Sequence, residues 1–231
     1  ITEVKLAKEP GQLHTVISSS GQEIQTRSVI ISTGATAKYL GLEDETKFAG
    51  SGVSACATCD GFFYKGRPVA VVGGGDTAAE EATYLAKLCT QVYLLVRRDE
   101  LRASKVMQER VFNTPNITVM FHHELIGLEG DKAVEKAKII NNQTNEVSEL
   151  AVDGVFIAIG HKPNTELFQG VLDMDETGYL ITEAKSTKTN VPGVFASGDV
   201  QDNVYRQAIT AAGTGCMAAL DAEKYVAEFF H

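Results

Sequence analysis

The sequence is poor in several residue types, and each shortage argues against a class of protein. Trp is absent, only five Pro occur in 231 residues, and no apolar run approaches the roughly 20 residues of a membrane-spanning helix. Four Cys are too few for a disulfide scaffold in a chain of this length. The first residues lack the basic and apolar segments of a secretory signal. We therefore expect a soluble, cytoplasmic protein without a membrane partner.

Charge and composition narrow the possibilities further. The 21 Lys and Arg against 30 Asp and Glu give a net charge of −9, which argues against a nucleic-acid partner. With 44% hydrophobic residues the chain can bury a core, so a disordered protein is excluded. The length suits one large or two small domains, because a domain usually takes about 100–200 residues.

Apolar runs and amphipathic segments alternate along the chain, which favours parallel sheet covered by helices. We predict helices at 77–88, 101–112 and 206–229, an antiparallel strand pair at 134–140 and 146–152, and further strands at 4–6, 13–17, 28–32, 68–72, 91–96, 117–121 and 155–159. Charged and turn residues interrupt the pattern at 38–47 and 162–168, so the ends of the chain should form one domain around a middle one. Because the chain starts in mid-pattern without Met, we expect it to be the interior of a longer protein.

A glycine loop follows the apolar strand that ends at Val72. In this Gly-x-Gly-x-x-Ala pattern Gly73 permits a tight turn, Gly75 lets the backbone approach a pyrophosphate, and Ala78 lets the helix lie close to the strand. The helix N-terminus adds free N–H groups and a positive dipole end. A second match at Gly50–Ala55 follows no apolar strand and is discarded. The loop predicts a dinucleotide site formed by Gly73, Gly74, Gly75, Asp76, Thr77 and Ala78.

Arginines at the end of the next strand indicate which dinucleotide binds. Arg97 and Arg98 follow Val96, and Arg102 is predicted one helical turn later. An NAD-binding unit usually carries Asp or Glu about 20 residues after the loop, where it bonds the ribose 2′-hydroxyl. Guanidinium groups instead match a 2′-phosphate. NADPH is favoured over NADH, with a solvated arginine surface as the alternative.

Two cysteines stand within disulfide reach in Cys56-Ala57-Thr58-Cys59. A redox pair is the favoured interpretation, because neighbouring thiols suit reversible disulfide exchange. A zinc site would need a second pair, but Cys89 and Cys216 are solitary, so no metal is expected. Inert buried cysteines are the third interpretation, and Cys89 is expected in the core. Asp60 could move protons as thiolates form and leave, or it could cap the turn that follows.

These motifs together resemble bacterial-type, low-molecular-weight thioredoxin reductase. The likeness covers essentially the whole chain, and related flavoproteins such as bacterial ferredoxin–NADP reductases lack the cysteine pair. The residues that carry it are Cys56–Phe63, Gly73–Ala78, Arg97–Asp99, Ala158–Asn164, Pro192–Val200, Tyr205–Ala208 and Gly213–Cys216.

The resemblance implies an α/β fold of two Rossmann-like, three-layer domains of the FAD/NAD(P)-binding type. Residues 42–166 would form the NADPH-binding domain with the cysteine pair, while 1–41 and 167–231 would belong to the FAD-binding domain. That second domain would be incomplete, since the family's Gly-x-Gly-x-x-Gly loop for the FAD pyrophosphate does not occur here. Val96 also departs from the family, which often has His there.

Cofactor contacts follow from the same resemblance. Gly198 and Asp199 would lie against the ribityl chain of FAD, although the same pair could be only a turn and cap. A helix starting near Arg206 would point its positive end at the reduced flavin. The FAD residues expected are Thr33, Gly34, Ala35, Gly198, Asp199, Arg206, Gln207 and Ala208; Ile159 and Gly160 join the cofactor-binding set.

The implied activity is NADPH-dependent reduction of thioredoxin by a homodimer. A hydride would pass from NADPH to FAD, and electrons would then pass to the Cys56–Cys59 disulfide and on to thioredoxin. Cys59 would lie nearer the flavin, Cys56 would attack the partner, and Asp60 would donate and accept protons. Two alternatives are a flavin-free, inactive NADP(H)-binding fragment and a reductase of another disulfide protein. We expect these 231 residues alone to be inactive.

Overall fold

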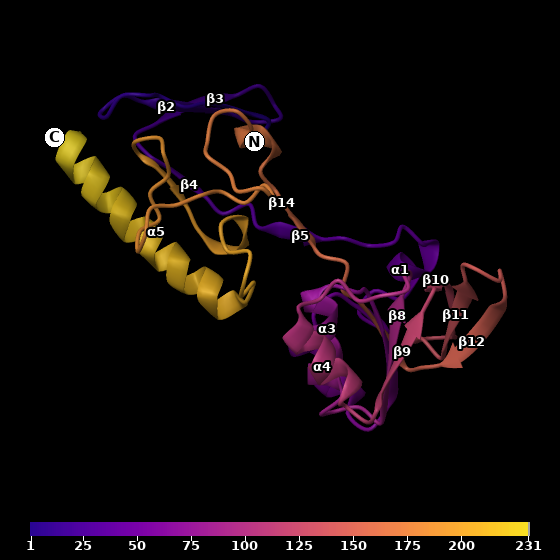
Figure 1. Ribbon diagram of the computed structural model, residues 1–231. Coiled ribbons are helices and arrows are strands. Elements are labelled where there is room, and N and C mark those ends of the chain that lie inside the picture. Colours follow the sequence, from indigo (N-terminus) through magenta and orange to yellow (C-terminus); the bar gives the residue numbers. More distant parts are fainter. Residues whose placement is uncertain (231) are drawn as a thin grey trace. The chain divides into compact units, whose positions relative to one another are not determined.

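The computed structural model describes residues 1–230 and divides into two compact units. Unit 1 contains residues 1–36 and the chain from 161 onward, and unit 2 contains residues 37–160. The strands β5 (Ala35–Ala37) and β14 (His161–Pro163) form a two-stranded sheet where the chain passes between units (Figure 1). The sequence placed these boundaries at 41/42 and 166/167, a few residues farther along the chain.

Unit 2 is built on a five-stranded sheet in the order β6-β13-β7-β8-β9, and every pairing in it is parallel. β7, β8 and β9 are consecutive strands joined by helical crossovers, whereas β6 and β13 lie on the other side of β7. This is a doubly wound arrangement, in which ligands bind where the strand order reverses. The strands are β6 (Val53–Ser54), β7 (Pro68–Val72), β8 (Gln91–Val96), β9 (Ile117–Phe121) and β13 (Gly154–Ile157).

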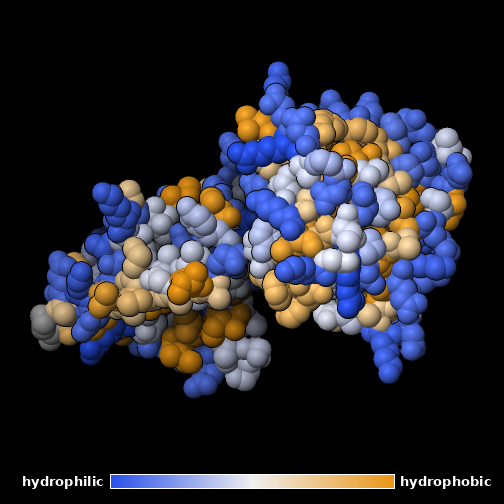
Figure 2. Space-filling view, turned by 90° about the horizontal axis from the view of Figure 1, so that it is seen from below, coloured by the Kyte–Doolittle hydropathy of each residue, from blue (hydrophilic) through white to orange (hydrophobic). Residues whose placement is uncertain are grey.

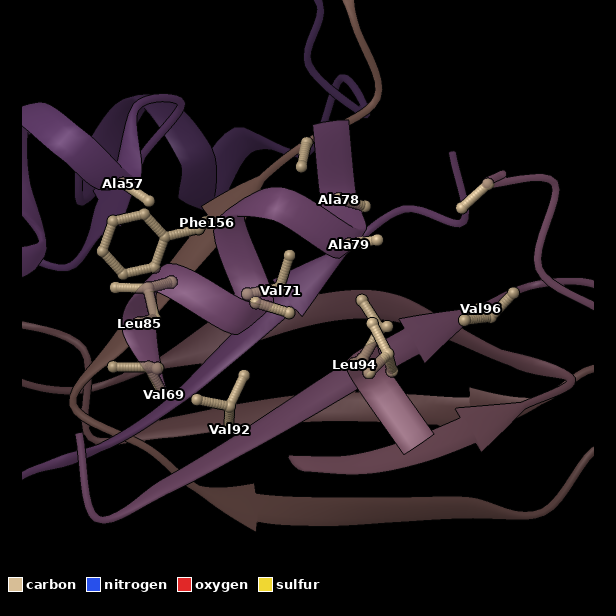
Figure 3. Close-up of a cluster of buried hydrophobic side chains, with 14 of the residues drawn as sticks. Ala57, Val69, Val71, Ala78, Ala79, Leu85, Val92, Leu94, Val96 and Phe156 are labelled. Carbon is tan, nitrogen blue, oxygen red and sulfur yellow. The ribbon is translucent and has the colours of Figure 1, made fainter. Parts of the chain in front are cut away.

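Successive residues of each strand point to opposite faces of this sheet, and helices cover one of the two faces. Val69 and Val71 of β7 belong to the same buried cluster as Ala78 and Ala79, and Figure 3 shows these strand side chains beneath the helix. Phe156 of β13 completes the cluster and is fully buried. The helices are α2 (Ala57–Asp60), α3 (Asp76–Leu85) and α4 (Lys105–Phe112), with the 3-10 turn η1 (Gly61–Tyr64) after α2.

The opposite face of the sheet is covered by a second, antiparallel sheet. Ala70 and Val72 point to this side and cluster with Leu128 and Ile139. The covering elements are α1 (Glu43–Lys47), β10 (His123–Glu129), β11 (Lys136–Asn141) and β12 (Val147–Ala151). Unit 2 therefore has three layers, with helices on one side of the parallel sheet and β10–β12 on the other.

Unit 1 has two smaller cores. Ile31 and Val194 lie in one, while Phe195 meets Ala218 and Tyr225 of the long C-terminal helix in the other. β1, β2 and β3 form an antiparallel sheet, and β4 pairs with β15 in parallel. The elements are β1 (Glu3–Lys5), β2 (His14–Ile17), β3 (Glu23–Thr26), β4 (Val29–Ile31), η2 (Glu166–Phe168), β15 (Val194–Ala196), η3 (Gly198–Val200) and α5 (Ala208–Phe229).

Several predicted elements differ from the structure for local reasons. The helix predicted at 101–112 begins only at Lys105, because the backbone N–H groups of Arg102 and Ala103 both donate to the Gly74 carbonyl. The helix predicted from 206 begins at Ala208, since Arg206 has a left-handed φ of 47°. The strand predicted to Ile159 ends at 157, and the structure adds β3 and β10, which the sequence did not predict.

Hydrophilic side chains cover much of the face in Figure 2, with smaller hydrophobic areas between them. Within residues 1–230 no helix combines the length and apolar character needed to cross a bilayer. The same residues contain no cluster of three or more His, Cys, Asp or Glu that could hold a metal ion.

A buried histidine in unit 1 makes stability depend on pH. His14 is 0% exposed, its Nδ1 accepts the Ala7 N–H at 3.1 Å, and burial lowers its pKa below the usual 6.5. Between that lowered pKa and 6.5 the unfolded chain binds more protons than the folded one. We therefore expect the free energy of unfolding to fall as pH drops below about 6.5, by at most about 1.4 kcal/mol per pH unit.

Urea unfolding between about pH 5 and 7.5 measures this slope. His14→Asn is the matched variant, because the asparagine carbonyl can still accept a hydrogen bond but does not titrate. Its unfolding free energy should vary less over this range. An equal pH dependence in variant and wild type would show that other groups cause it.

Candidate active site

The glycine loop follows β7 and leads into α3, as predicted. Gly73 has φ of 148°, and a Cβ on it would lie 2.4 Å from the Ala158 carbonyl oxygen and 2.8 Å from the Ala78 Cβ. No other residue fits there, so the close approach of β7, β13 and α3 depends on this glycine. A Cβ on Gly75 would meet no atom within 4 Å, so the start of α3 is open to a ligand.

A cavity of about 440 Å³ lies in unit 2 at the carboxyl ends of β7, β8 and β13. Its walls include Arg97, Arg98 and Arg102 together with the backbone of the glycine loop. The other predicted residues that line it are Thr77, Ile159 and Gly160. Ala78 is fully buried behind the loop and Asp76 is exposed outside the cavity, so neither lines it.

Arg102 lines the cavity, but it precedes α4 and does not lie in the predicted helix. Its backbone N–H donates to the Gly74 carbonyl at 2.7 Å, which ties the segment after β8 to the glycine loop. Asp76 holds the same segment, since its carboxylate accepts the Ser104 N–H at 2.8 Å. Hydrogen bonds from the backbone and the side chain of Ser104 lower the pKa of Asp76. Asp76 thus supports the loop, and none of the three arginines forms an ion pair within the described residues.

β10 brings further residues to the cavity that the sequence analysis missed. His123 and Glu124 line it, and the Asn142 side-chain amide donates to the Glu124 carboxylate at 2.7 Å and to the Arg97 carbonyl at 2.8 Å. No motif marks these residues, because β10 itself carries no clear strand pattern. Only the fold brings them next to the arginines.

The cysteine pair forms a disulfide at the start of α2. Cys56 is the N-cap residue of this short helix, and its sulfur accepts the Cys59 N–H at 3.2 Å and lies 3.4 Å from the Thr58 hydroxyl. Ala57 is 1% exposed and anchors the helix in the core, whereas Thr58 and Cys59 are exposed. A fixed anchor with an accessible disulfide suits thiol exchange with another protein.

Asp60 is held by a serine from the preceding strand. The Ser54 hydroxyl donates to the Asp60 carboxylate at 2.6 Å, and Ser54 is only 6% exposed. Asp60 occupies the cap position of η1, but its side chain makes no capping hydrogen bond. The structure therefore gives no support to the alternative that Asp60 is a turn cap.

The remaining two cysteines form no disulfide within residues 1–230. Cys89 is 6% exposed in the hydrophobic core, as predicted, and burial raises its pKa to about 11. Cys216 is exposed on α5. Cys89 belongs to unit 2 and Cys216 to unit 1.

In unit 1 several predicted residues surround the start of α5. Gly198 has φ of 71° and its N–H donates to the Thr214 hydroxyl on α5 at 2.9 Å. Asp199 is half-buried, and its carboxylate makes no hydrogen bond within the described residues. Gln207 is the N-cap residue of α5 and Ala208 its first residue, while the Arg206 guanidinium donates to the Asn203 carbonyl.

The predicted residues 33–35 follow Ser32, whose hydroxyl oxygen lies 2.7 Å from that of Ser197, and they contact Asn164. The Thr33 hydroxyl donates to the Asn164 carbonyl at 2.6 Å, and the Asn164 side chain returns a bond to the Thr33 carbonyl at 2.9 Å. The Asn164 N–H donates to the Gly34 carbonyl at 2.9 Å, and Ala35 begins β5. These bonds fix the two chain segments that join the units.

Comparison with known proteins gives a consistent result. Residues 2–215 match the family model described as pyridine nucleotide-disulphide oxidoreductase. A thioredoxin reductase of Rickettsia conorii is 52% identical over 229 residues, which are 98% of this chain and 73% of that protein. The solved thioredoxin reductase of Giardia duodenalis has a TM-score of 0.90 at 39% identity, with 98% of this chain and 74% of that one covered. The enzyme of Streptococcus pyogenes has a TM-score of 0.91 at 34% identity, covering 99% and 73%.

Proposed function

Because this chain belongs to the pyridine nucleotide-disulphide oxidoreductase family, and its close relatives are thioredoxin reductases, we propose that it reduces thioredoxin at the expense of NADPH. The fold is the Rossmann-like FAD/NAD(P)-binding type, and the cofactors of the family are FAD and NADPH. The observation that carries the proposal is the disulfide at α2 in the same unit as a dinucleotide loop and cavity.

The residues around the cavity fit NADPH. A Cβ at Gly73 would collide with the neighbouring strand, and Gly75 leaves the helix N-terminus open, which suits a pyrophosphate. Within residues 1–230 no carboxylate forms an ion pair with Arg97, Arg98 or Arg102, so their guanidinium groups are available to a 2′-phosphate. We assign the nicotinamide dinucleotide to this cavity, with Ile159 and Gly160 along its wall.

Unit 1 contains groups that suit FAD. The half-buried Asp199 carboxylate has no hydrogen-bond partner within the described residues, and it could accept hydrogen bonds from ribityl hydroxyls. The N-terminus of α5 at Gln207 and Ala208 offers a positive dipole end to the isoalloxazine. We propose Gly198, Arg206 and the segment 33–35 as further parts of this site.

NADPH held at the glycine loop would supply a hydride, and FAD held in unit 1 would supply two-electron redox chemistry. The chain's own residues do the sulfur chemistry. Two electrons and two protons convert the Cys56–Cys59 disulfide into two thiols. The Cys56 thiolate then attacks the thioredoxin disulfide and releases one partner sulfur, and Cys59 attacks the mixed disulfide and releases the other. Asp60 would hold and return the proton at each change of sulfur charge.

The contacts of Cys56 support its role as the attacking residue. Its sulfur accepts the Cys59 N–H, and a donor to sulfur favours the thiolate, which is the nucleophile. A homodimer is proposed from the family resemblance, and the cytoplasmic location expected from the sequence also stays a proposal. The expectation that these 231 residues are inactive by themselves likewise stays a prediction.

A single-turnover experiment tests the proposed activity without any cofactor. The chain is reduced with dithiothreitol, desalted and mixed with oxidised thioredoxin, and free thiols are counted by alkylation and intact mass. We expect about one thioredoxin disulfide reduced for each chain, with return of the Cys56–Cys59 disulfide. Absence of transfer would contradict thioredoxin as the partner and favour a reductase of another disulfide protein. The visible spectrum and NADPH oxidation of the same sample separate a flavoenzyme from a flavin-free NADP(H)-binding chain.

A further inference from the structure

The buried hydroxyl of Ser54 contacts both ends of the segment 56–60, which contains the cysteine pair. Ser54 is at the end of β6, two residues before Cys56, and it is 6% exposed. Its Oγ lies 2.6 Å from the Asp60 carboxylate and 3.1 Å from the Cys56 backbone nitrogen. The segment 56–60 contains both cysteines, so these two contacts of Ser54 connect the first residue of the segment to its last.

The directions of these hydrogen bonds follow from the chemistry of a hydroxyl, which has one hydrogen and two lone pairs. The Cys56 N–H can only donate, so Ser54 Oγ accepts there. The single hydroxyl hydrogen then has two candidate acceptors, the Asp60 carboxylate at 2.6 Å and the Cys56 carbonyl at 3.4 Å. The shorter bond is in the range of a charge-assisted O–H···O⁻ contact, so the hydrogen points to Asp60.

We infer that Ser54 is a positioning residue for proton transfer at the redox pair. It holds one oxygen of the Asp60 carboxylate, whose other oxygen makes no hydrogen bond within the described residues. The same hydroxyl fixes the backbone of Cys56, so acid and sulfur keep one relative geometry while the disulfide opens and closes. This inference rests on the proposed proton-transfer role of Asp60.

Two other titratable side chains lie close to the redox pair. Tyr64 on η1 interacts with Asp60, and burial together with the Asp60 charge raises the Tyr64 pKa above its usual 10.0. Glu81 on α3 accepts the Ala57 N–H at 3.4 Å, close to the first cysteine. Both side chains are unchanged in the Ser54 variants, so a change in the transfer rate of those variants reports on the serine.

The step to be measured is the transfer from the two thiols of Cys56 and Cys59 to oxidised thioredoxin. Two electrons and two protons leave the chain, its disulfide forms, and the two thioredoxin sulfurs become thiols. Pre-reduced chain is mixed with thioredoxin and quenched with acid, and the thiols are counted by alkylation and mass. The measurement needs neither NADPH nor FAD.

We expect Ser54→Ala to slow this transfer about tenfold, the effect of losing one hydrogen bond to a charged group. Ser54→Thr, which keeps the hydroxyl, should stay within about twofold of wild type. Ser51→Ala removes a hydroxyl from the same segment that makes no side-chain hydrogen bond, and it should leave the rate unchanged.

Asp60→Asn provides the decisive comparison. If Ser54 acts through Asp60, the double variant Ser54→Ala with Asp60→Asn should be no slower than Asp60→Asn alone. Multiplied losses in the double variant, or a Ser54→Thr variant as slow as Ser54→Ala, would overturn the inference.

The inference and the proposed function can fail separately. A wild-type rate in Asp60→Asn would remove the acid–base role of Asp60 and the inference with it, while transfer to thioredoxin would stand. A slow Asp60→Asn with a normal Ser54→Ala would remove only the role of Ser54. Should Ser54→Ala not fold, Ser54→Val takes its place, since valine has the shape of threonine but no hydroxyl.

Discussion

Replacing both Arg97 and Arg98 with alanine is expected to weaken NADPH binding about 100-fold. Both side chains line the cavity at the end of β8, and in the described part of the chain neither forms an ion pair with a carboxylate that would compete with the phosphate. A hydrogen bond to a charged group contributes about 1.5–3 kcal/mol, and each 1.4 kcal/mol is a factor of ten in affinity. NADH has no 2′-phosphate, so its affinity should change by less than about twofold.

Calorimetric titration of the chain with each nucleotide measures both affinities without turnover. Arg110→Ala is the matched control, because Arg110 lies on α4 in the same unit but outside the cavity, and it should bind both nucleotides normally. Equal weakening of NADPH and NADH in the double variant would show that the arginines do not recognise a 2′-phosphate.

Cys59→Ser is expected to stop thioredoxin reduction at the mixed disulfide. Cys56 can still attack a partner disulfide, but no second thiol remains to release the product. The probe is a thioredoxin with one active-site cysteine, activated with a thionitrobenzoate group. Pre-reduced Cys59→Ser should accumulate a one-to-one covalent adduct, whereas pre-reduced wild type should release reduced thioredoxin. Net reduction should fall by at least about 1,000-fold, as on loss of other essential catalytic groups.

Cys56→Ser is the matched comparison and should form the adduct at least about 100-fold more slowly, because the attacking residue is gone. All variants are made in a Cys216→Ser background, since Cys216 is exposed and could also react. Intact mass identifies the adduct. Faster adduct formation in Cys56→Ser than in Cys59→Ser would exchange the roles of the two cysteines. NADPH binding should be unchanged in both, because neither cysteine lines the cavity.

The sequence predicted the parts of the fold whose pattern is local. β7, β8 and β9 have the predicted bounds because buried parallel strands read as continuous apolar runs. The prediction of helix for the residues just before α4 was wrong, because the N–H groups of Arg102 and Ala103 donate to the Gly74 carbonyl instead of forming helical hydrogen bonds. That competition depends on Gly74, which lies far from Arg102 in the sequence, so no local pattern reveals it. Polar β10 carried no readable signal either.

The candidate site shows the same division. The glycine loop and the cysteine pair are contiguous motifs, so spacing alone predicts their chemistry. Ser54 and Glu124 are single polar residues whose importance comes from the side chains that the fold brings next to them. Asp76 belonged to the predicted dinucleotide residues, yet its carboxylate supports Ser104. The fold therefore decides which neighbours each side chain of a motif contacts, and the motif alone does not.

Core burial of the Cys89 thiol has a practical consequence for following the redox state. With a pKa of about 11, this sulfur stays protonated near neutral pH and has no access to reagent while the chain is folded. A colorimetric titration in native buffer therefore detects Cys216 in the oxidised form and gains the signal of two further sulfurs on reduction. The late appearance of a fourth sulfur during urea addition would mark the unfolding of the parallel-sheet core itself.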